Sequence, residues 1–241
     1  MKFITLGTAC GFPVKGRGCE ANLLEVNGSI YFFDAGVSLA EALANLEYDY
    51  NAVKAVFITH AHTDHINTVG QLVNLSTWRY KEMRFGVYVP TQSCVDFARL
   101  LSESIDKGKI DEERVTFTIY DNGVIYQDEN IKVTAFHSAH IEKAHSFLVE
   151  AEGKRLFITG DLESTMESLS SEATEKSNDF ILVECAHFPE SVVLDVFPKL
   201  NAKRVVITHI GRTVPIEKVQ QFIDEGKIKG EIADDYQEFI I

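Results

Sequence analysis

Three separate segments of the chain repeat one local pattern: an apolar run of β-forming residues, then threonine, then a side chain that can bind a metal ion. The pattern occurs at residues 56–60 (Val-Phe-Ile-Thr-His), 156–161 (Leu-Phe-Ile-Thr-Gly-Asp) and 206–209 (Val-Ile-Thr-His). A fourth apolar run, within residues 133–140, also leads into histidine. Buried strands that end in such residues direct them to one edge of a sheet, where a rigid scaffold can hold a functional site. The pattern therefore predicts a sheet protein with a metal site at its strand ends.

The first segment continues into the densest group of potential ligands in the chain, residues 60–65 (His-Ala-His-Thr-Asp-His). In an extended turn, His60 and His62 can face one metal ion. Asp64 and His65 can turn toward a second ion as the next helix begins. Imidazole and carboxylate groups suit zinc, manganese or iron. The alternative, a group of solvated loop histidines, leaves the matching strand contexts elsewhere in the chain unexplained.

Asp161 ends a different strand, and its carboxylate could bridge the two ions. A hydroxide that bridges two metal ions has a lowered pKa and is a nucleophile at neutral pH, while both ions neutralise charge on the substrate. The sequence therefore predicts a cofactor of two divalent metal ions. Zinc is expected first, with manganese or iron as alternatives.

Strand and helix patterns are mixed along the chain, with no linker or low-complexity tract between them. Asn27-Gly28 between two apolar runs predicts a hairpin. Ser38 with Glu41 predicts a capped helix over residues 38–46, and a further helix is expected over 165–176. Hairpins combined with isolated buried strands do not fit a purely alternating βα fold. We therefore predict an α/β fold, a four-layer αββα sandwich, in a single domain over residues 1–241.

The chain is acidic, with a formal net charge of −13 over 241 residues. This charge repels polyanions at long range, and nonspecific nucleic-acid binding depends on Lys and Arg contacts to phosphates. A small anionic substrate is therefore a better candidate partner than a long nucleic acid. The four cysteines include no C-x-x-C pair, which argues against a zinc knuckle and against a disulfide framework.

The first residues of the chain are typical of a strand and not of a signal peptide. No segment offers the roughly 18 consecutive apolar residues of a membrane span. We therefore expect a cytoplasmic protein with no membrane partner.

The pattern His-x-His-x-Asp-His after a buried strand resembles the metallo-β-lactamase superfamily. Residues 6–8 (Leu-Gly-Thr) and 33–36 (Phe-Asp-Ala-Gly) are similar to that superfamily's first two conserved turns. The resemblance implies the αββα fold, a binuclear site and hydrolysis, with Asp34 supporting the metal loop. It implies two sets of ligands that share Asp161. One set is His60, His62, His140 and Asp161, and the other is Asp64, His65, His209 and Asp161.

Three histidines compete for the third motif of this resemblance: His137, His140 and His145. In phosphodiesterase-like members, the ligand precedes by several positions a strand that opens with a small and then an aromatic residue. His140, followed by Ser146-Phe147, has that spacing. His137 and His145 are expected to be packed or supporting imidazoles.

Within the superfamily, the chain is most similar to the branch of tRNase Z and the cyclic-phosphate phosphodiesterases. Residues 13–17 (Pro-Val-Lys-Gly-Arg) resemble the Pro-x-Lys-x-Arg loop of tRNase Z, and residues 208–211 resemble the fifth motif of small phosphodiesterases. Residues 183–187 take the place of that branch's acidic strand end. A long glycine- and proline-rich arm is absent between His65 and His140. Members of this branch often form dimers, so a homodimer is a further expectation.

The predicted catalytic residues are Asp64, Glu184 and His187. His187 is expected to act as an acid or proton relay that Glu184 orients, and its alternative is a surface histidine after a strand. Three basic residues could hold a phosphate by charge-assisted hydrogen bonds, although solvated loop positions are the alternative. They are Lys15, Arg17 and Arg212.

Three functions are compatible with these residues. The first is a phosphodiesterase for a small or cyclic phosphodiester, with tRNA 3′-processing endonuclease as the alternative within the same branch. The second is a hydrolase of carboxylic esters, lactones or thioesters, although the Pro-Gly-His-Thr-like third motif of the glyoxalase and β-lactamase branches is absent. The third is a non-catalytic metal-binding sensor, against which the full ligand set argues.

Overall fold

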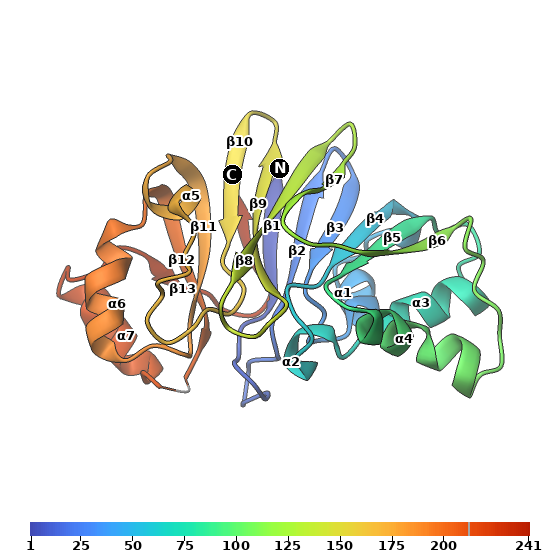
Figure 1. Cartoon of the computed structure of the whole chain (residues 1–241), viewed down its shortest axis with the longest axis horizontal. Helices are drawn as coiled ribbons and strands as arrows, with labels where there is room; N and C mark the ends of the chain where they lie inside the picture. Colours follow the sequence, from blue (N-terminus) through green and yellow to red (C-terminus); the bar gives the residue numbers. More distant parts are fainter. Residues whose placement is uncertain (212) are drawn as a thin grey trace.

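The structure is a computed structural model that describes residues 1–211 and 213–241. Two seven-stranded mixed sheets pack face to face in the middle of the molecule (Figure 1). The first sheet has the order β14 (Gln237–Ile240), β1 (Lys2–Gly7), β2 (Ala21–Val26), β3 (Ser29–Phe33), β4 (Val53–Phe57), β5 (Phe85–Val89) and β6 (Val115–Ile119). The second has the order β13 (Glu231–Ile232), β12 (Ala202–Ile210), β11 (Asn178–Cys185), β10 (Lys154–Ile158), β9 (Ala144–Ala151), β8 (Ile131–Ser138) and β7 (Gly123–Gln127).

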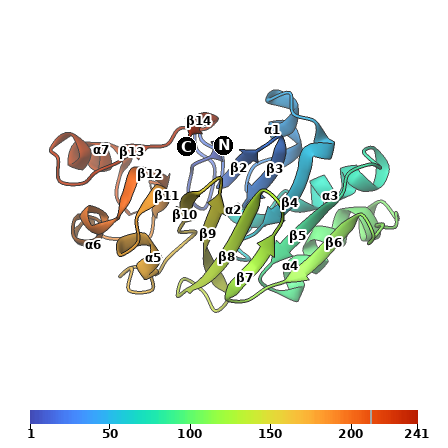
Figure 2. The same ribbon diagram turned by 90° about the horizontal axis from the view of Figure 1, so that it is seen from above.

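Helices cover the outer side of each sheet, as the view from above shows (Figure 2). The helices beside the first sheet are α1 (Leu39–Asn45), α3 (Val69–Trp78) and α4 (Gln92–Arg99), which continues into a π-helical segment over Leu100–Ile105. The single turn α2 (Thr63–Ile66) lies at the edge of the sheets. The helices beside the second sheet are α5 (Ser171–Thr174), α6 (Glu190–Val196) and α7 (Ile216–Asp224). Single 3-10 turns span Tyr50–Ala52 and Phe197–Lys199. The four layers confirm the predicted αββα sandwich.

Alternate residues of the strands enter different apolar cores, because successive side chains of a strand point to opposite faces. Phe3 of β1 faces the second sheet, and its ring centroid lies 5.0 Å from that of Phe180 in β11. Ile4 points the other way, into the core beneath α1 and α3. Ile207 of β12 enters a third core beneath α6 and α7. Three cores separate four layers, so both faces of each sheet are buried.

Parallel pairing brings the strand ends of each half to one edge. β3, β4, β5 and β6 run parallel to one another, and so do β10, β11, β12 and β13. The carboxyl ends of parallel strands meet at the same edge of a sheet. This edge carries α2 and lies at the bottom of Figure 1.

Two local predictions are confirmed and one is wrong. The hairpin at Asn27-Gly28 joins β2 to β3, and Ser38 caps α1 by accepting a hydrogen bond from the backbone N–H of Glu41 at 3.1 Å. The helix expected over 165–176 is reduced to the single turn α5. Met166 interrupts it with a left-handed backbone, at a φ of 57°. Within the described residues, the helices are too short or too polar to cross a membrane.

Candidate metal centre

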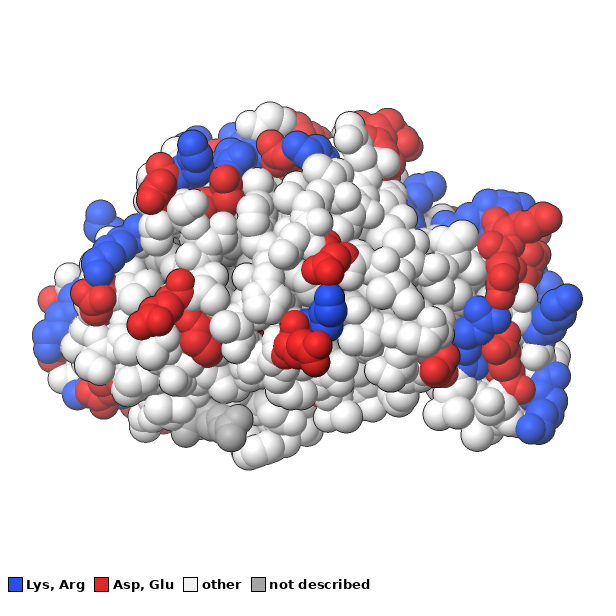
Figure 3. Space-filling model, viewed as in Figure 1, with Lys and Arg blue, Asp and Glu red and all other residues white. Residues whose placement is uncertain are grey.

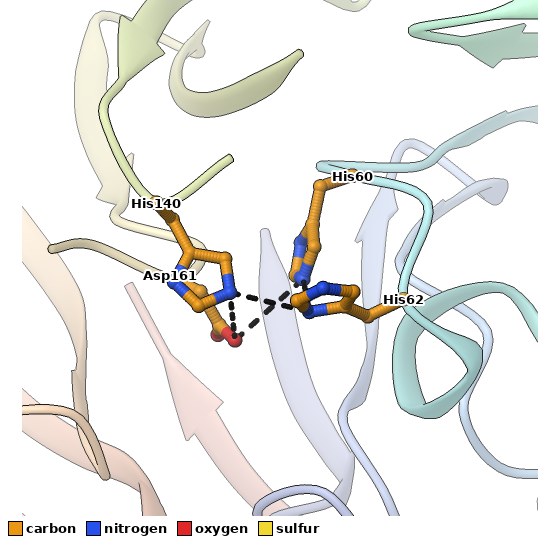
Figure 4. Close-up of side chains that lie close together, drawn as sticks. All are labelled: His60, His62, His140 and Asp161. Atoms are coloured by element: carbon orange, nitrogen blue, oxygen red, sulfur yellow. Dashed lines mark hydrogen bonds and ion pairs between the residues drawn. The ribbon is translucent and has the colours of Figure 1, made fainter. Parts of the chain in front are cut away.

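Four of the predicted ligands meet where β4, β8 and β10 end. His60 follows β4, His62 lies in the turn before α2, His140 follows β8 and Asp161 follows β10. Figure 4 shows the four side chains pointing toward one another. Nδ1 of His62 lies 2.9 Å from Nε2 of His60 and 3.2 Å from Nε2 of His140. Ligand atoms about 2.0–2.1 Å from a zinc ion stand roughly 3.3 Å from one another in a tetrahedron, so this spacing fits a bound ion.

The other three predicted ligands form a second group beside the first. Nε2 of His65 and Nε2 of His209 lie 3.5 and 3.7 Å from Oδ2 of Asp64. Asp161 reaches this group as well, because its Oδ1 lies 3.4 Å from Nε2 of His65 and its Oδ2 lies 3.4 Å from Nε2 of His209. The same Oδ2 lies 3.6 Å from Nε2 of His60. Asp161 is therefore the carboxylate that the two groups share.

A buried hydrogen-bond network orients the imidazoles from behind. Asp34 accepts hydrogen bonds from the backbone N–H of Thr59 at 2.8 Å, from the Thr59 hydroxyl at 2.9 Å and from Nδ1 of His65 at 2.8 Å. Because the Thr59 hydroxyl donates to Asp34, its oxygen can accept from Nδ1 of His60 at 3.0 Å. A proton on Nδ1 of each imidazole would satisfy these contacts and leave Nε2 for a metal ion.

The structure separates the three histidines that compete for the third motif. His140 joins the first group, and its Nδ1 lies 3.3 Å from the carbonyl oxygen of Leu162. His145 is buried beside Tyr120, at 4.9 Å between ring centroids, and neither ring nitrogen has a hydrogen-bond partner among the described residues. His137 is exposed, with its Nε2 3.2 Å from a backbone carbonyl. Of the three, the placement favours His140 as a ligand.

Glu20 is a supporting residue that the sequence reasoning missed. Its buried carboxylate accepts hydrogen bonds from the hydroxyl of Thr208 at 2.9 Å and from the side-chain amide of Asn22 at 2.7 Å. Its Oε2 lies 3.7 Å from Nδ1 of His209. Glu20 thus stands behind His209 as Asp34 stands behind His65. The one signal in the sequence is an acidic residue directly before an apolar strand, which many surface turns share.

The buried carboxylates and unpaired polar atoms of the cluster favour a cation at its centre. Nε2 of His65 and Oδ1 of Asp161 are buried without a hydrogen-bond partner among the described residues. Burial lowers the pKa of His65, but the charges of Asp161 and Asp34 outweigh burial and hold that pKa well above its ordinary value. Burial raises the pKa of Asp161, but His209 and His65 hold it well below the ordinary value. A divalent cation satisfies both the orphaned atoms and the carboxylates, so the donor set fits a metal ion.

Glu184 and His187 lie together at the end of β11, next to the cluster. The Glu184 carboxylate accepts hydrogen bonds from the backbone N–H of Leu162 at 2.9 Å and of Ala186 at 2.8 Å, and lies 2.9 Å from Nδ1 of His187. Nδ1 of His187 is also 3.8 Å from Oδ2 of Asp161. Burial lowers the pKa of His187, but the hydrogen bond and charge of Glu184 raise it above its ordinary value. His187 therefore holds its proton to higher pH than a free histidine.

The three basic residues predicted to contact substrate have different placements. Lys15 is exposed on the loop that follows β1. Arg17 turns toward the C-terminal segment, where it donates to the carbonyl oxygen of Ala233 and to Asp234 at 2.5 Å. Because its guanidinium is engaged there, this placement does not support a phosphate-holding role for Arg17. Arg212 lies outside the described residues.

The sequence of the chain matches a known protein family and a curated relative. Residues 1–210 match the model of a protein family described as anti-Pycsar protein Apyc1. The chain belongs to the Apyc1 family. This Apyc1-family chain is 24% identical to a ribonuclease Z from Anoxybacillus flavithermus over 309 aligned positions, which cover 100% of this chain and 97% of the relative. Since this chain has 241 residues, the ribonuclease Z carries insertions that the Apyc1-family chain lacks.

Two solved structures share the fold over nearly their whole length. The metallo-β-lactamase fold protein YhfI from Bacillus subtilis superposes with a TM-score of 0.79 at 15% identity, covering 99% of this chain and 98% of that one. The short form of human tRNase Z superposes with a TM-score of 0.74 at 18% identity, covering 100% and 99%. The Apyc1-family chain is a metal-dependent hydrolase of the metallo-β-lactamase superfamily, in the branch of tRNase Z and the phosphodiesterases.

Proposed function

We propose that the protein hydrolyses a small or cyclic phosphodiester, such as a cyclic nucleotide, at a site that holds two divalent ions. Zinc is the first candidate, with manganese or iron as alternatives. The observation that carries the proposal is the position of Asp161 between two ligand groups, beside a histidine that Glu184 holds. Similarity to a ribonuclease Z along the whole chain supports phosphodiester chemistry.

In this proposal, one set of residues holds the metal ions and another residue moves a proton. One ion would be held by His60, His62, His140 and Asp161, and the other by Asp64, His65, His209 and Asp161. When bound, divalent ions lower the pKa of water and neutralise charge on phosphate oxygens. Asp34 would orient His65 directly and His60 through the hydroxyl of Thr59, and Glu20 lies 3.7 Å from Nδ1 of His209.

His187 is the proposed proton donor to the leaving alkoxide. The contact of Glu184 with Nδ1 leaves Nε2 to face a ligand. Although burial lowers the pKa of His187, Glu184 raises it above its ordinary value, which favours the protonated form that a donor needs. A positioned acid of this kind contributes about 10²–10⁴-fold to a rate.

The first test is hydrolysis of bis(p-nitrophenyl) phosphate by protein reconstituted with zinc or manganese. We expect metal-dependent cleavage that His62→Ala abolishes, because this variant removes one ligand from the first group. His137→Ala is the matched control, since its side chain is exposed and outside both groups. Cleavage of a nitrophenyl carboxylic ester without cleavage of the phosphodiester would refute the proposal.

A second test separates the proton donor from the metal ligands. Nitrophenolate leaves without protonation, whereas the alkoxide of a cyclic nucleotide needs a proton. We therefore expect His187→Ala to slow cyclic-nucleotide hydrolysis by at least about 100-fold and to leave bis(p-nitrophenyl) phosphate cleavage within a few-fold of wild type. Equal losses on both substrates would contradict the assignment of His187.

Processing of tRNA 3′ ends is the second candidate function, favoured by the same match to ribonuclease Z. Two features count against it. The chain lacks the insertions of that relative, and on the face shown in Figure 3 the Lys and Arg side chains are mixed with Asp and Glu. Incubation with a tRNA precursor, next to a panel of cyclic nucleotides, distinguishes the two substrate classes.

A further inference from the structure

The loop between β1 and β2 presents two large apolar side chains to solvent beside the metal centre. Phe12 is 69% exposed and Val14 is 52% exposed. The loop reaches the second ligand group directly, because the backbone N–H of Gly11 donates to Oδ2 of Asp64 at 2.9 Å. The exposed phenyl ring therefore lies one residue from a contact with a candidate metal ligand.

This exposure does not reflect a loose loop, because hydrogen bonds fix the segment on both sides. Val14 and Arg17 exchange two backbone hydrogen bonds of 3.0 Å, which close a tight turn. The guanidinium of Arg17 and the backbone N–H of Gly18 attach that turn to Asp234 and Asp235. These hydrogen bonds fix the loop while the side chain of Phe12 is exposed. A fixed aromatic group loses little conformational freedom when it binds a ligand.

A hollow of about 370 Å³ opens between this loop and the segment that follows β12. Phe12, Val14 and Lys15 line one side, and Ile210, Pro215 and Ile216 line the other. Ile210 directly follows His209, so one wall of the hollow is the chain segment that carries a member of the second ligand group. Its volume is within the range of small-molecule sites, about 300–1,000 Å³.

The chemistry of the hollow matches a flat ring with polar edges. The phenyl ring and the aliphatic side chains offer apolar surfaces to the faces of a ring. Lys15 offers a donor and Glu217 an acceptor at the rim. Among the described residues, Lys15 forms no ion pair.

We propose that this hollow binds the nucleobase of the substrate, stacked on Phe12, while the phosphate lies on the metal cluster. This inference rests on the proposed function, because it assigns a base to the phosphodiester. Every base has a π-face, so stacking selects nucleotides over other phosphate esters and is tolerant of the base itself. Phe12 is then a specificity-determining residue.

The test is calorimetric binding of nucleoside 5′-monophosphates and of ribose 5-phosphate to zinc-loaded protein. The two ligands share the sugar and the phosphate, so their difference in affinity isolates the base. We expect wild type to bind AMP or CMP at least about five-fold more tightly than ribose 5-phosphate, as one stacked base provides. Phe12→Ala should remove this advantage and Phe12→Trp should keep it.

Phe97→Ala is the matched control, because it removes a partly exposed phenyl ring from α4. Equal affinities of wild type for the two ligands would overturn the proposal, and so would a base advantage that survives in Phe12→Ala. A base advantage that depends on Phe12, in a protein that cleaves no phosphodiester, would uphold the base site and refute the proposed reaction alone.

Discussion

At the scale of residues, the threonine that precedes each strand-end ligand has a structural task. The hydroxyl of Thr59 joins Asp34 to His60, and the hydroxyl of Thr208 donates to Glu20 behind His209. Thr159 accepts a hydrogen bond from the backbone N–H of Glu184 at 3.1 Å. The repeated threonines thus build the support of the site, and they explain why the three segments look alike.

His145 makes a residue-scale prediction about pH. It is buried, its two ring nitrogens lack hydrogen bonds among the described residues, and burial lowers its pKa although Asp121 acts in the opposite direction. Between that lowered pKa and the ordinary value of about 6.5, the folded protein binds fewer protons than the unfolded chain. Stability therefore rises with pH through this window and falls as pH decreases through it.

We expect His145→Leu to reduce the loss of unfolding free energy between pH 7.5 and pH 5.5, as measured by urea denaturation. The reduction is partial, because burial also lowers the pKa values of His60 and His140. His137→Leu, at an exposed position facing His145, is the comparison variant and should change the pH dependence less than His145→Leu does, because burial is the largest cause of the lowered pKa of His145. An unchanged dependence in His145→Leu would contradict this account.

The residues of the site were predictable to different degrees. The structure brings all seven predicted ligands together, because strand ends and a compact histidine motif constrain position strongly. Glu20 was missed and Arg17 has a different partner from the one expected. Both depend on contacts with distant segments, which local sequence patterns do not encode.

At the scale of elements, three strand ends at the site contain a residue with left-handed backbone. His209 has a φ of 52° at the end of β12, and Gly160 has a φ of 56° before Asp161. Asp34 has a φ of 63° after β3. Such backbone is uncommon for residues other than glycine and tends to concentrate at functional sites.

Gly36 provides a prediction at this scale, because it lies where two loops of the site meet. A Cβ atom at this position would lie 2.0 Å from the carbonyl oxygen of Asp64 and 2.7 Å from that of Glu20. We expect Gly36→Ala to displace the loop of residues 60–65 and to lower the metal content per chain, measured by atomic emission. Metal content at the wild-type level would contradict this prediction and would show that the loop of residues 60–65 can shift without losing metal ions.

Gly70→Ala is the control for that substitution. It lies within α3, and its added Cβ would stand 3.3 Å from the nearest atom, the carbonyl oxygen of Ala98. Alanine is also a better helix former than glycine. Gly70→Ala should therefore keep the wild-type metal content.

Elements with strong local signals were predicted well, and one with weak signals was not. The capped helix α1 and the hairpin at Asn27-Gly28 depend on nearby residues alone. The helix expected over 165–176 failed because the side chain of Glu163 accepts a 2.6 Å hydrogen bond from the backbone N–H of Ser168 and stabilises a turn instead. Side-chain bonds of this kind compete with helix formation.

At the scale of the whole molecule, aromatic rings join the two sheets. Phe57 of β4 is fully buried, and its ring centroid lies 5.2 Å from that of Phe33 in the same sheet. From the second sheet, Tyr126 and Phe147 lie at 5.4 and 6.2 Å. The interface of the sheets is thus a continuous core, which supports our proposal that residues 1–241 form a single domain.

We expect Phe57→Ala to lower the free energy of unfolding by about 3–5 kcal/mol, because it leaves a cavity between the sheets. Urea denaturation followed by circular dichroism and by Trp78 fluorescence should give coincident transitions in wild type, as a single cooperative domain requires. Phe97→Ala, at a partly exposed ring, should have a much smaller effect. Two separate transitions in wild type would contradict the single domain.

The division of the ligands between the two sheets has a consequence for biosynthesis. His60, His62, Asp64 and His65 belong to the first half of the chain. In the second half, His140 and Asp161 follow strands of the second sheet, and His209 lies near the end of β12. A ribosome has therefore translated most of the message before the last ligand, His209, emerges. Filling of both candidate ligand groups would accordingly be a late event, and the metal content of the protein would report a finished fold.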